Sequence, residues 1–222
     1  MGLVINRSIS LQQNYRYDTN DIIGLRAIDH ACESLCSTLP HGEEFDNYAI
    51  SALKLLLPGL LEVKLSPSTS AYMKCQEGAW NAIKPVIANP PVQLGASHAI
   101  GHKLGGVFKI DHGVTSCVML PAVMEWNIST NRERQEQIVE VFRQTGVLRK
   151  LEERGLKTGM AGELLRGYIK ILEMSGGLNR IGVGREKWEL LAKESLTDPW
   201  LHTNPRKVHG PEDLMEIFEL AE

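Results

Sequence analysis

The sequence of 222 residues predicts an all-α protein, and two observations favour that class. From residue 21 onward, apolar residues recur with the 3.6-residue period of amphipathic helices. Only 6% of the residues are aromatic, whereas Leu, Ile, Val, Ala and Gly are plentiful, which suits packed helices better than a β-sandwich. With 43% hydrophobic and 23% charged residues, the chain can form a substantial core and is not a disordered protein.

The predicted organisation is a helical bundle over residues 21–222 that follows an extended tail over residues 1–20. Within the tail, residues 1–9 indicate a short strand and its exit. We expect Pro58 to kink or break the second helix of the bundle. The expected helices span residues 21–37, 45–65, 68–87, 93–107, 114–126, 132–145, 147–154, 159–174, 185–195 and 212–221.

Charge, hydropathy and cysteine content exclude several classes of protein. The net charge of −3 implies no basic surface, which argues against nucleic acid as a ligand. No apolar stretch approaches the ~20 residues that cross a bilayer, and no secretory signal opens the chain, so we expect a cytoplasmic protein without membrane contact. No C-x-x-C pair occurs, and the thiols are expected to be buried and reduced: Cys32, Cys36, Cys75 and Cys117.

Three histidines fall within fifteen residues of one glycine-rich segment: His98, His102 and His112. His98 and His102 are four residues apart, so on a helix they share one face. Such a pair can bind one metal ion, or divide its roles between a ligand and an acid–base group. A single histidine on a helix is usually a surface or core residue, but three among glycines favour a site.

A second candidate segment lies on the first expected helix, where Arg26 and His30 are also four residues apart. Glu33 is on the His30 side of this helix, whereas Asp29 points roughly 100° away from His30. No G-x-G-x-x-G motif follows a strand, so the sequence contains no visible nucleotide-binding unit.

Three segments in order carry a resemblance to a known family. They are GLRAIDHACESLCS (24–37), GASHAIGHKLGGVFKIDHGVTSCVMLPAVMEWN (95–127) and DPWLHTNPRKVHGPEDLMEIFELA (198–221). Together they resemble the C-terminal helical domain of iron-containing alcohol dehydrogenases, in particular the maleylacetate reductase-like branch. In that family an α/β domain that binds NAD(P) precedes the helical domain. The resemblance therefore implies that this half is absent here, and that NAD(P) is not a cofactor of the chain.

The resemblance also implies roles for individual residues. His30, His98 and His112 match the metal-binding positions of the family, which would hold Fe or Zn. His102 matches the histidine beside the nicotinamide and substrate that is assigned to proton transfer. Arg26 stands where the family has an aspartate as the fourth metal ligand, and a guanidinium repels a divalent cation. Arg26 could instead hold a carboxylate or enolate oxygen.

Three functions are compatible with these observations. We favour a stand-alone enzyme that uses His102 and Arg26 as catalytic groups for non-redox chemistry, namely cyclisation, isomerisation or dehydration. Its substrate would be a small oxygenated organic metabolite, bound by Arg26, His30, His98 and His112. The alternatives are an NAD(P)-dependent oxidoreductase whose nucleotide domain is supplied in trans, and an inactive binding module. We expect a homodimer, because a lone strand and uncovered apolar helices need a partner.

Overall fold

The computed structural model describes residues 19–174 and 176–222, so the predicted strand over residues 1–9 lies outside the described part. Within that part every regular element is helical, as predicted, and no strand occurs. The first helix begins at Thr19, two residues before the expected boundary. The elements are α1 (Thr19–Cys36), α2 (Glu43–Leu65), α3 (Thr69–Ile87), α4 (Ala96–Gly106), α5 (His112–Gln144), α6 (Val147–Glu152), α7 (Ala161–Ile171), η1 (Arg185–Lys187), α8 (Trp188–Ser195), η2 (Pro199–Thr203) and α9 (Pro211–Leu220).

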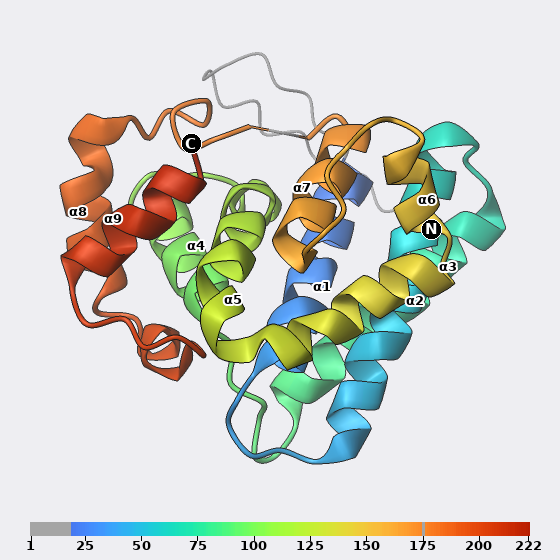
Figure 1. Cartoon of the computed structure of the whole chain (residues 1–222), viewed down its shortest axis with the longest axis horizontal. Helices are drawn as coiled ribbons and strands as arrows, with labels where there is room; N and C mark the ends of the chain where they lie inside the picture. Colours follow the sequence, from blue (N-terminus) through green and yellow to red (C-terminus); the bar gives the residue numbers. More distant parts are fainter. Residues whose placement is uncertain (1–18, 175) are drawn as a thin grey trace, which may run out of the picture.

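Two proline- or loop-based expectations about helix boundaries need correction. The expected break at Pro58 does not occur, since α2 continues through this residue as a single element with buried residues on both sides of it. The expected helices 114–126 and 132–145 are the two halves of α5, which joins them across a kink at Asn131, where φ is −131° and ψ is 33°. Figure 1 shows the two halves of α5 running in different directions. The Asn131 side chain donates a hydrogen bond to the Cys36 carbonyl, which ties the kink to the end of α1.

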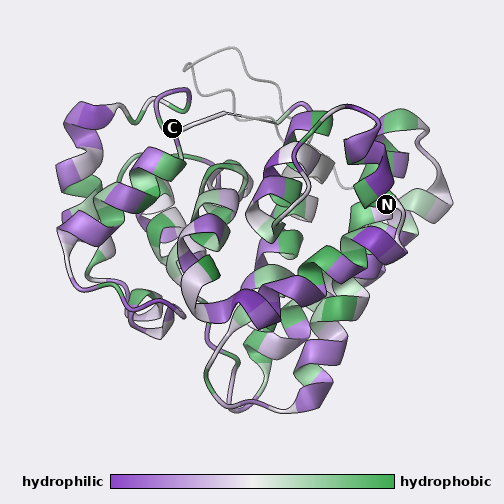
Figure 2. Ribbon diagram, in the orientation of Figure 1, coloured by the Kyte–Doolittle hydropathy of each residue, from purple (hydrophilic) through white to green (hydrophobic). Residues whose placement is uncertain are grey.

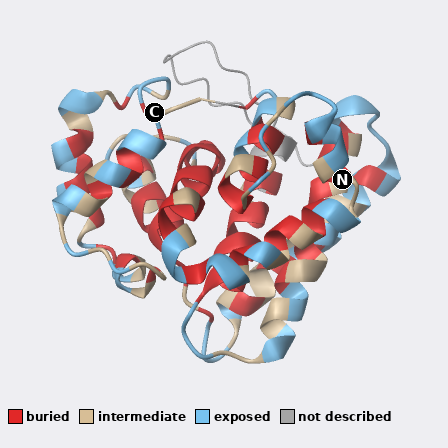
Figure 3. Ribbon diagram, in the orientation of Figure 1, coloured by how far each residue is buried: buried red, intermediate tan, exposed pale blue. Residues whose placement is uncertain are grey.

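The helix α1 lies at the centre of the fold and packs against α2, α3 and α5 (Figure 1). The helix α4 packs between α5 on one side and α8 with η2 on the other. Buried residues concentrate in α1, α4 and the first half of α5, as Figure 3 shows. Figure 2 shows that α9 and the second half of α5 carry hydrophilic residues beside hydrophobic ones, as expected of helices at the surface. The polar residues described below therefore lie on buried, central helices.

No helix in the described part of the chain is both long and apolar enough to cross a membrane. None of the four cysteines is in a disulfide, and Cys32, Cys36 and Cys117 are buried as expected, whereas Cys75 is only partly buried.

Candidate active site

One face of α1 carries polar side chains in an otherwise apolar, buried helix. They are Arg26, Asp29, His30 and Glu33, at positions i, i+3, i+4 and i+7, so they line one side of the helix. Asp29, His30 and Glu33 are buried, and Arg26 is partly exposed. Buried polar groups need partners. The partners come from the first turn of α4, which lies against this face.

The Glu33 carboxylate caps the N-terminus of α4. It accepts hydrogen bonds from the backbone N–H groups of Gly95 (3.1 Å), Ser97 (2.9 Å) and His98 (3.2 Å). Asn204 accepts from the remaining N–H of this turn, that of Ala96. The first four N–H groups of a helix lack intrahelical acceptors, so Glu33 and Asn204 together satisfy all of them. A Cβ on Gly95 would lie 2.7 Å from the Asn204 Oδ1 atom, and only glycine lets these groups approach so closely.

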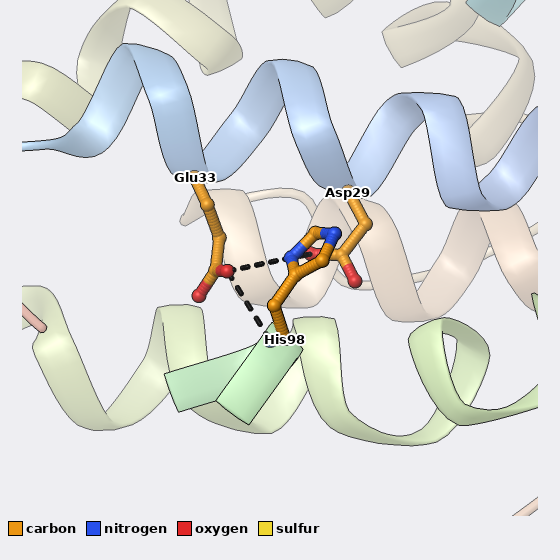
Figure 4. A group of neighbouring side chains, drawn as sticks. All are labelled: Asp29, Glu33 and His98. Carbon is orange, nitrogen blue, oxygen red and sulfur yellow. Dashed lines mark hydrogen bonds and ion pairs between the residues drawn. The ribbon is translucent and has the colours of Figure 1, made fainter. Parts of the chain in front are cut away.

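His98 is held between the two carboxylates of α1, as Figure 4 shows. Its Nδ1 atom lies 2.8 Å from Glu33 Oε2 and 3.6 Å from Asp29 Oδ1. The Ser97 hydroxyl donates to the other Asp29 oxygen at 2.9 Å. Because a carboxylate only accepts, the Nδ1 atom of His98 carries the proton. The sequence analysis placed Asp29 roughly 100° away from His30 on the helix. Both residues nevertheless contact His98, since the Asp29 carboxylate lies 3.6 Å from its Nδ1 atom and the His30 ring stacks on it.

The Asp29–His98 pair retains a proton toward neutral pH. Burial raises the pKa of Asp29 to about 6, although the charge of His98 opposes this shift. Burial acts to lower the pKa of His98, but the charges of Asp29 and Glu33 outweigh it and raise that pKa above its ordinary value. Both pKa values are raised, so the buried cluster holds one proton more readily than separate groups would.

His30 stacks on His98, with ring centroids 4.5 Å apart and an angle of 21° between the planes. Burial, followed by the positive charges of His98 and Arg26, lowers the pKa of His30 to about 2. His30 is therefore a neutral imidazole throughout the physiological range. The Nε2 atom of His98 is buried beside it and has no hydrogen-bond partner.

His102 and His112 form the outer part of the histidine cluster. Their rings lie 5.5 Å apart, and the Trp200 ring of η2 lies 5.0 Å from that of His102. The His102 Nδ1 atom lies 3.0 Å from an oxygen of Asp198, and the His102 side chain is one-third exposed. Asp198 itself is buried and caps η2 by accepting from the backbone N–H of Trp200. His102 is thus an accessible imidazole with a fixed orientation.

His112 is the first residue of α5, which begins two residues before the expected boundary at residue 114. Asp111 caps this helix by accepting from the Gly113 N–H, which fixes where α5 begins. Burial and then the charge of Arg26 lower the pKa of His112. The same guanidinium charge lowers the pKa of His30 and opposes protonation of His98. Arg26 therefore acts electrostatically on all three imidazoles.

The structure brings all five sequence-predicted site residues into one cluster: Arg26, His30, His98, His102 and His112. Their chemical roles stay predictions. Sequence reasoning missed Asp198 and Trp200 as members of the site and gave Glu33 no role. Asp198 followed by Pro199 is a recognisable helix-start signal, but nothing in the sequence pairs it with His102, which lies 96 residues earlier.

A divalent metal does not fit this group of side chains. The unpartnered Nε2 atom of His98 could bind one, and the His30 ring is stacked on the His98 ring 4.5 Å away. However, the positive charge of the Arg26 guanidinium acts on His30, His98 and His112 and would repel a divalent cation held by them. Asp29, Glu33 and His98 do have potential ligand atoms within 4.8 Å of one another, but Glu33 is already engaged by the first turn of α4.

The chain belongs to the Fe-containing alcohol dehydrogenase family, whose C-terminal part it matches over residues 22–221. It is 29% identical over 213 residues to Dehydrogenase FUM7 of Gibberella moniliformis (strain M3125 / FGSC 7600), a match that covers 89% of this chain and 50% of that protein. It is 30% identical over 208 residues to the NAD-dependent methanol dehydrogenase of Bacillus methanolicus, with the same two coverages. The chain thus spans about half the length of the relatives it matches.

Solved structures of the family share this fold. An alcohol dehydrogenase from Oenococcus oeni superposes with a TM-score of 0.75 at 27% identity, over 91% of this chain and 51% of that chain. Maleylacetate reductase from Rhizobium sp. strain MTP-10005 also gives a TM-score of 0.75, over 90% of this chain and 51% of that one. At 22% identity, the second likeness shows the fold alone.

Proposed function

We propose that this chain carries out non-redox acid–base chemistry, namely cyclisation, isomerisation or dehydration, on a carbonyl group of a small oxygenated organic metabolite. The observation that carries the proposal is the permanent charge of Arg26 beside the imidazoles of His30, His98 and His112. A guanidinium presents a planar fork of N–H donors that suits a carboxylate or enolate oxygen. Arg26 would thus stabilise the negative charge that develops on the substrate.

His102 is the proposed acid–base group. Its Nδ1 atom donates to Asp198, which leaves the lone pair of Nε2 to act as a base. Nε2 would remove a proton from the carbon beside the carbonyl, the C–H electron pair would form a C=C bond, and the carbonyl oxygen would become an enolate paired with Arg26. Isomerisation ends when His102 returns the proton at another carbon. Dehydration ends when the proton leaves with a β-hydroxyl as water.

The other three histidines are proposed to bind the substrate. Neutral His30 and the unpartnered, buried Nε2 atom of His98 form the inner end of the site, and His112 lies beside His102 at the outer end. The four cysteines are outside disulfides, which supports the proposal that the protein works in a reducing cytoplasm.

Solvent deuterium exchange tests this chemistry without knowledge of the natural product. A panel of small oxo acids and diketones is incubated with the protein in D₂O, and loss of the C–H signal beside the carbonyl is followed by NMR. We expect enzyme-dependent exchange that Arg26→Gln and His102→Ala abolish. The matched control is His209→Ala, which changes a histidine outside the cluster. Exchange that survives in the His102→Ala variant would contradict the proposed role of this residue.

A second candidate is an NAD(P)-dependent oxidoreductase with its nucleotide domain supplied in trans. The names of the relatives favour it, since they are described as dehydrogenases. It predicts oxidation of NAD(P)H in the presence of an aldehyde or oxo acid once a separate nucleotide-binding chain is added. An inactive binding module would show neither this oxidation nor deuterium exchange.

A further inference from the structure

Arg26 lies on the same face of α1 as His30, whose ring stacks on that of His98 at 4.5 Å. It lies one turn before His30 on α1, and its charge disfavours a second positive charge on His30, His98 and His112 alike. A cation held by these three imidazoles would be a close neighbour of the guanidinium. Two like charges in a partly buried site repel strongly, because little water screens them.

The two carboxylates of α1 are not placed to compensate for that repulsion. Both oxygens of Glu33 accept from the backbone of α4, and one of them also accepts from His98 Nδ1. Asp29 accepts from the Ser97 hydroxyl and faces the same Nδ1 edge of His98. The unpartnered Nε2 atom is on the other edge of the ring, so neither carboxylate completes a ligand set there.

We propose that Arg26 is the resident cation of this site and that it excludes a divalent metal from the three histidines. The replacement of this one residue by a carboxylate should therefore convert the cluster into a metal site with one oxygen and three nitrogen ligands. This inference goes beyond the proposed acid–base function and is tested without any substrate, so the two can fail separately.

The test is metal binding by the untagged full chain. Wild type and Arg26→Asp are stripped with a chelator, dialysed against Zn²⁺ or Co²⁺, and measured by elemental analysis and by the visible absorption of bound Co²⁺. We expect the variant to hold one ion per chain with an affinity at least ~100-fold above that of the wild type, which should hold none stoichiometrically. One tightly bound ion in the wild type would overturn the proposal. So would a folded Arg26→Asp variant that binds none.

Two further variants separate the effect of removing the Arg26 charge from that of adding a ligand, and locate the bound ion. Arg26→Gln removes the charge without adding a ligand, and we expect its Zn²⁺ affinity to lie at least ~10-fold above that of the wild type. If Arg26→Asp fails to fold, as judged by circular dichroism, this variant carries the test, and an affinity equal to that of the wild type would overturn the proposal. Adding His98→Ala to Arg26→Asp should abolish the gained ion, whereas adding His202→Ala should leave it, which locates the ion at the cluster.

Discussion

At the scale of single residues, His102 combines the two properties that an acid–base group needs. Asp198 fixes the ring through Nδ1, and one-third of the side chain is open to a substrate. We expect His102→Ala to lower turnover by ~10²–10⁴-fold while the fold is unchanged, the usual contribution of one general acid or base. The measurement is the deuterium-exchange rate at saturating substrate, with the thermal unfolding curve as the check on folding. Full activity in this variant would rule out the assignment.

The buried, neutral state of His30 should make the stability of the protein depend on pH. Its pKa is about 2 in the folded state, against an ordinary value of 6.5. Between these two pH values, His30 is protonated in the unfolded chain and neutral in the folded chain. The contribution of neutral His30 to the free energy of unfolding is therefore complete above pH 6.5. It decreases as the pH falls below this value, by about 1.4 kcal/mol per pH unit at most. His30→Phe removes this proton uptake. We therefore expect the free energy of unfolding of His30→Phe, relative to that of the wild type, to increase as the pH falls from 7 to 4.

The comparison with a variant is necessary because Asp29 affects the pH dependence of the free energy of unfolding in the opposite direction to His30. Its pKa is raised from 3.8 to about 6, so between these values the folded state binds the extra proton and becomes more stable as the pH falls. The wild-type curve alone would show the two effects partly cancelled. Urea unfolding of both proteins at several pH values gives the difference, and two parallel curves would contradict the assignment to His30.

At the scale of elements, the contact between α1 and the start of α4 depends on Glu33. Removing its carboxylate leaves three buried N–H groups and the His98 Nδ1–H without acceptors. We expect Glu33→Ala to lower the free energy of unfolding by about 3 kcal/mol or more. The matched control is Glu62→Ala, which breaks a half-exposed pair with Lys74 and should cost about 1 kcal/mol or less. Chemical denaturation measures both, and equal losses would show that Glu33 is not a structural cap.

The same contact shows what sequence reasoning could and could not predict. Periodicity located the helices and placed Arg26 with His30, and His98 with His102, because residues four apart on one helix are neighbours. It could not pair Glu33 with the first turn of α4, since that contact spans 62 to 65 residues of sequence. Periodicity indicated two separate helices where α5 is kinked at Asn131, and it could not show the tertiary hydrogen bond from this residue to the end of α1.

At the scale of the whole molecule, the described residues 19–174 and 176–222 offer no phosphate-binding loop for a dinucleotide. No G-x-G-x-x-G motif occurs after a strand in the sequence, and the described residues contain helices and loops only. We therefore expect the isolated 222-residue chain not to bind NAD(H) or NADP(H) tightly. Calorimetric titration tests this, and a dissociation constant in the low micromolar range would favour the dehydrogenase function over the acid–base function.

The outer face of α3 bears on the predicted homodimer. Met73, Trp80 and Ile87 recur every seven residues along this helix, and each has more than half of its surface exposed, at 63%, 58% and 62%. Large apolar side chains in such a row are typical of a helix that packs against another helix. The row is symmetric about Trp80, so an antiparallel copy would place Met73 against Ile87 of the second chain. A two-fold dimer can therefore bury the whole row.

We accordingly expect sedimentation at micromolar concentration to give a dimer of the 24.7 kDa chain. Trp80→Glu places a charge at the centre of the row and should shift the protein to the monomer, because a buried, unpaired carboxylate is strongly unfavourable. The control is Leu65→Glu, a change at an equally exposed apolar residue (64%) at the end of α2, and it should leave the dimer intact. A wild-type monomer would refute the dimer itself. A dimer that survives Trp80→Glu would instead move the interface away from α3 to another surface of the chain.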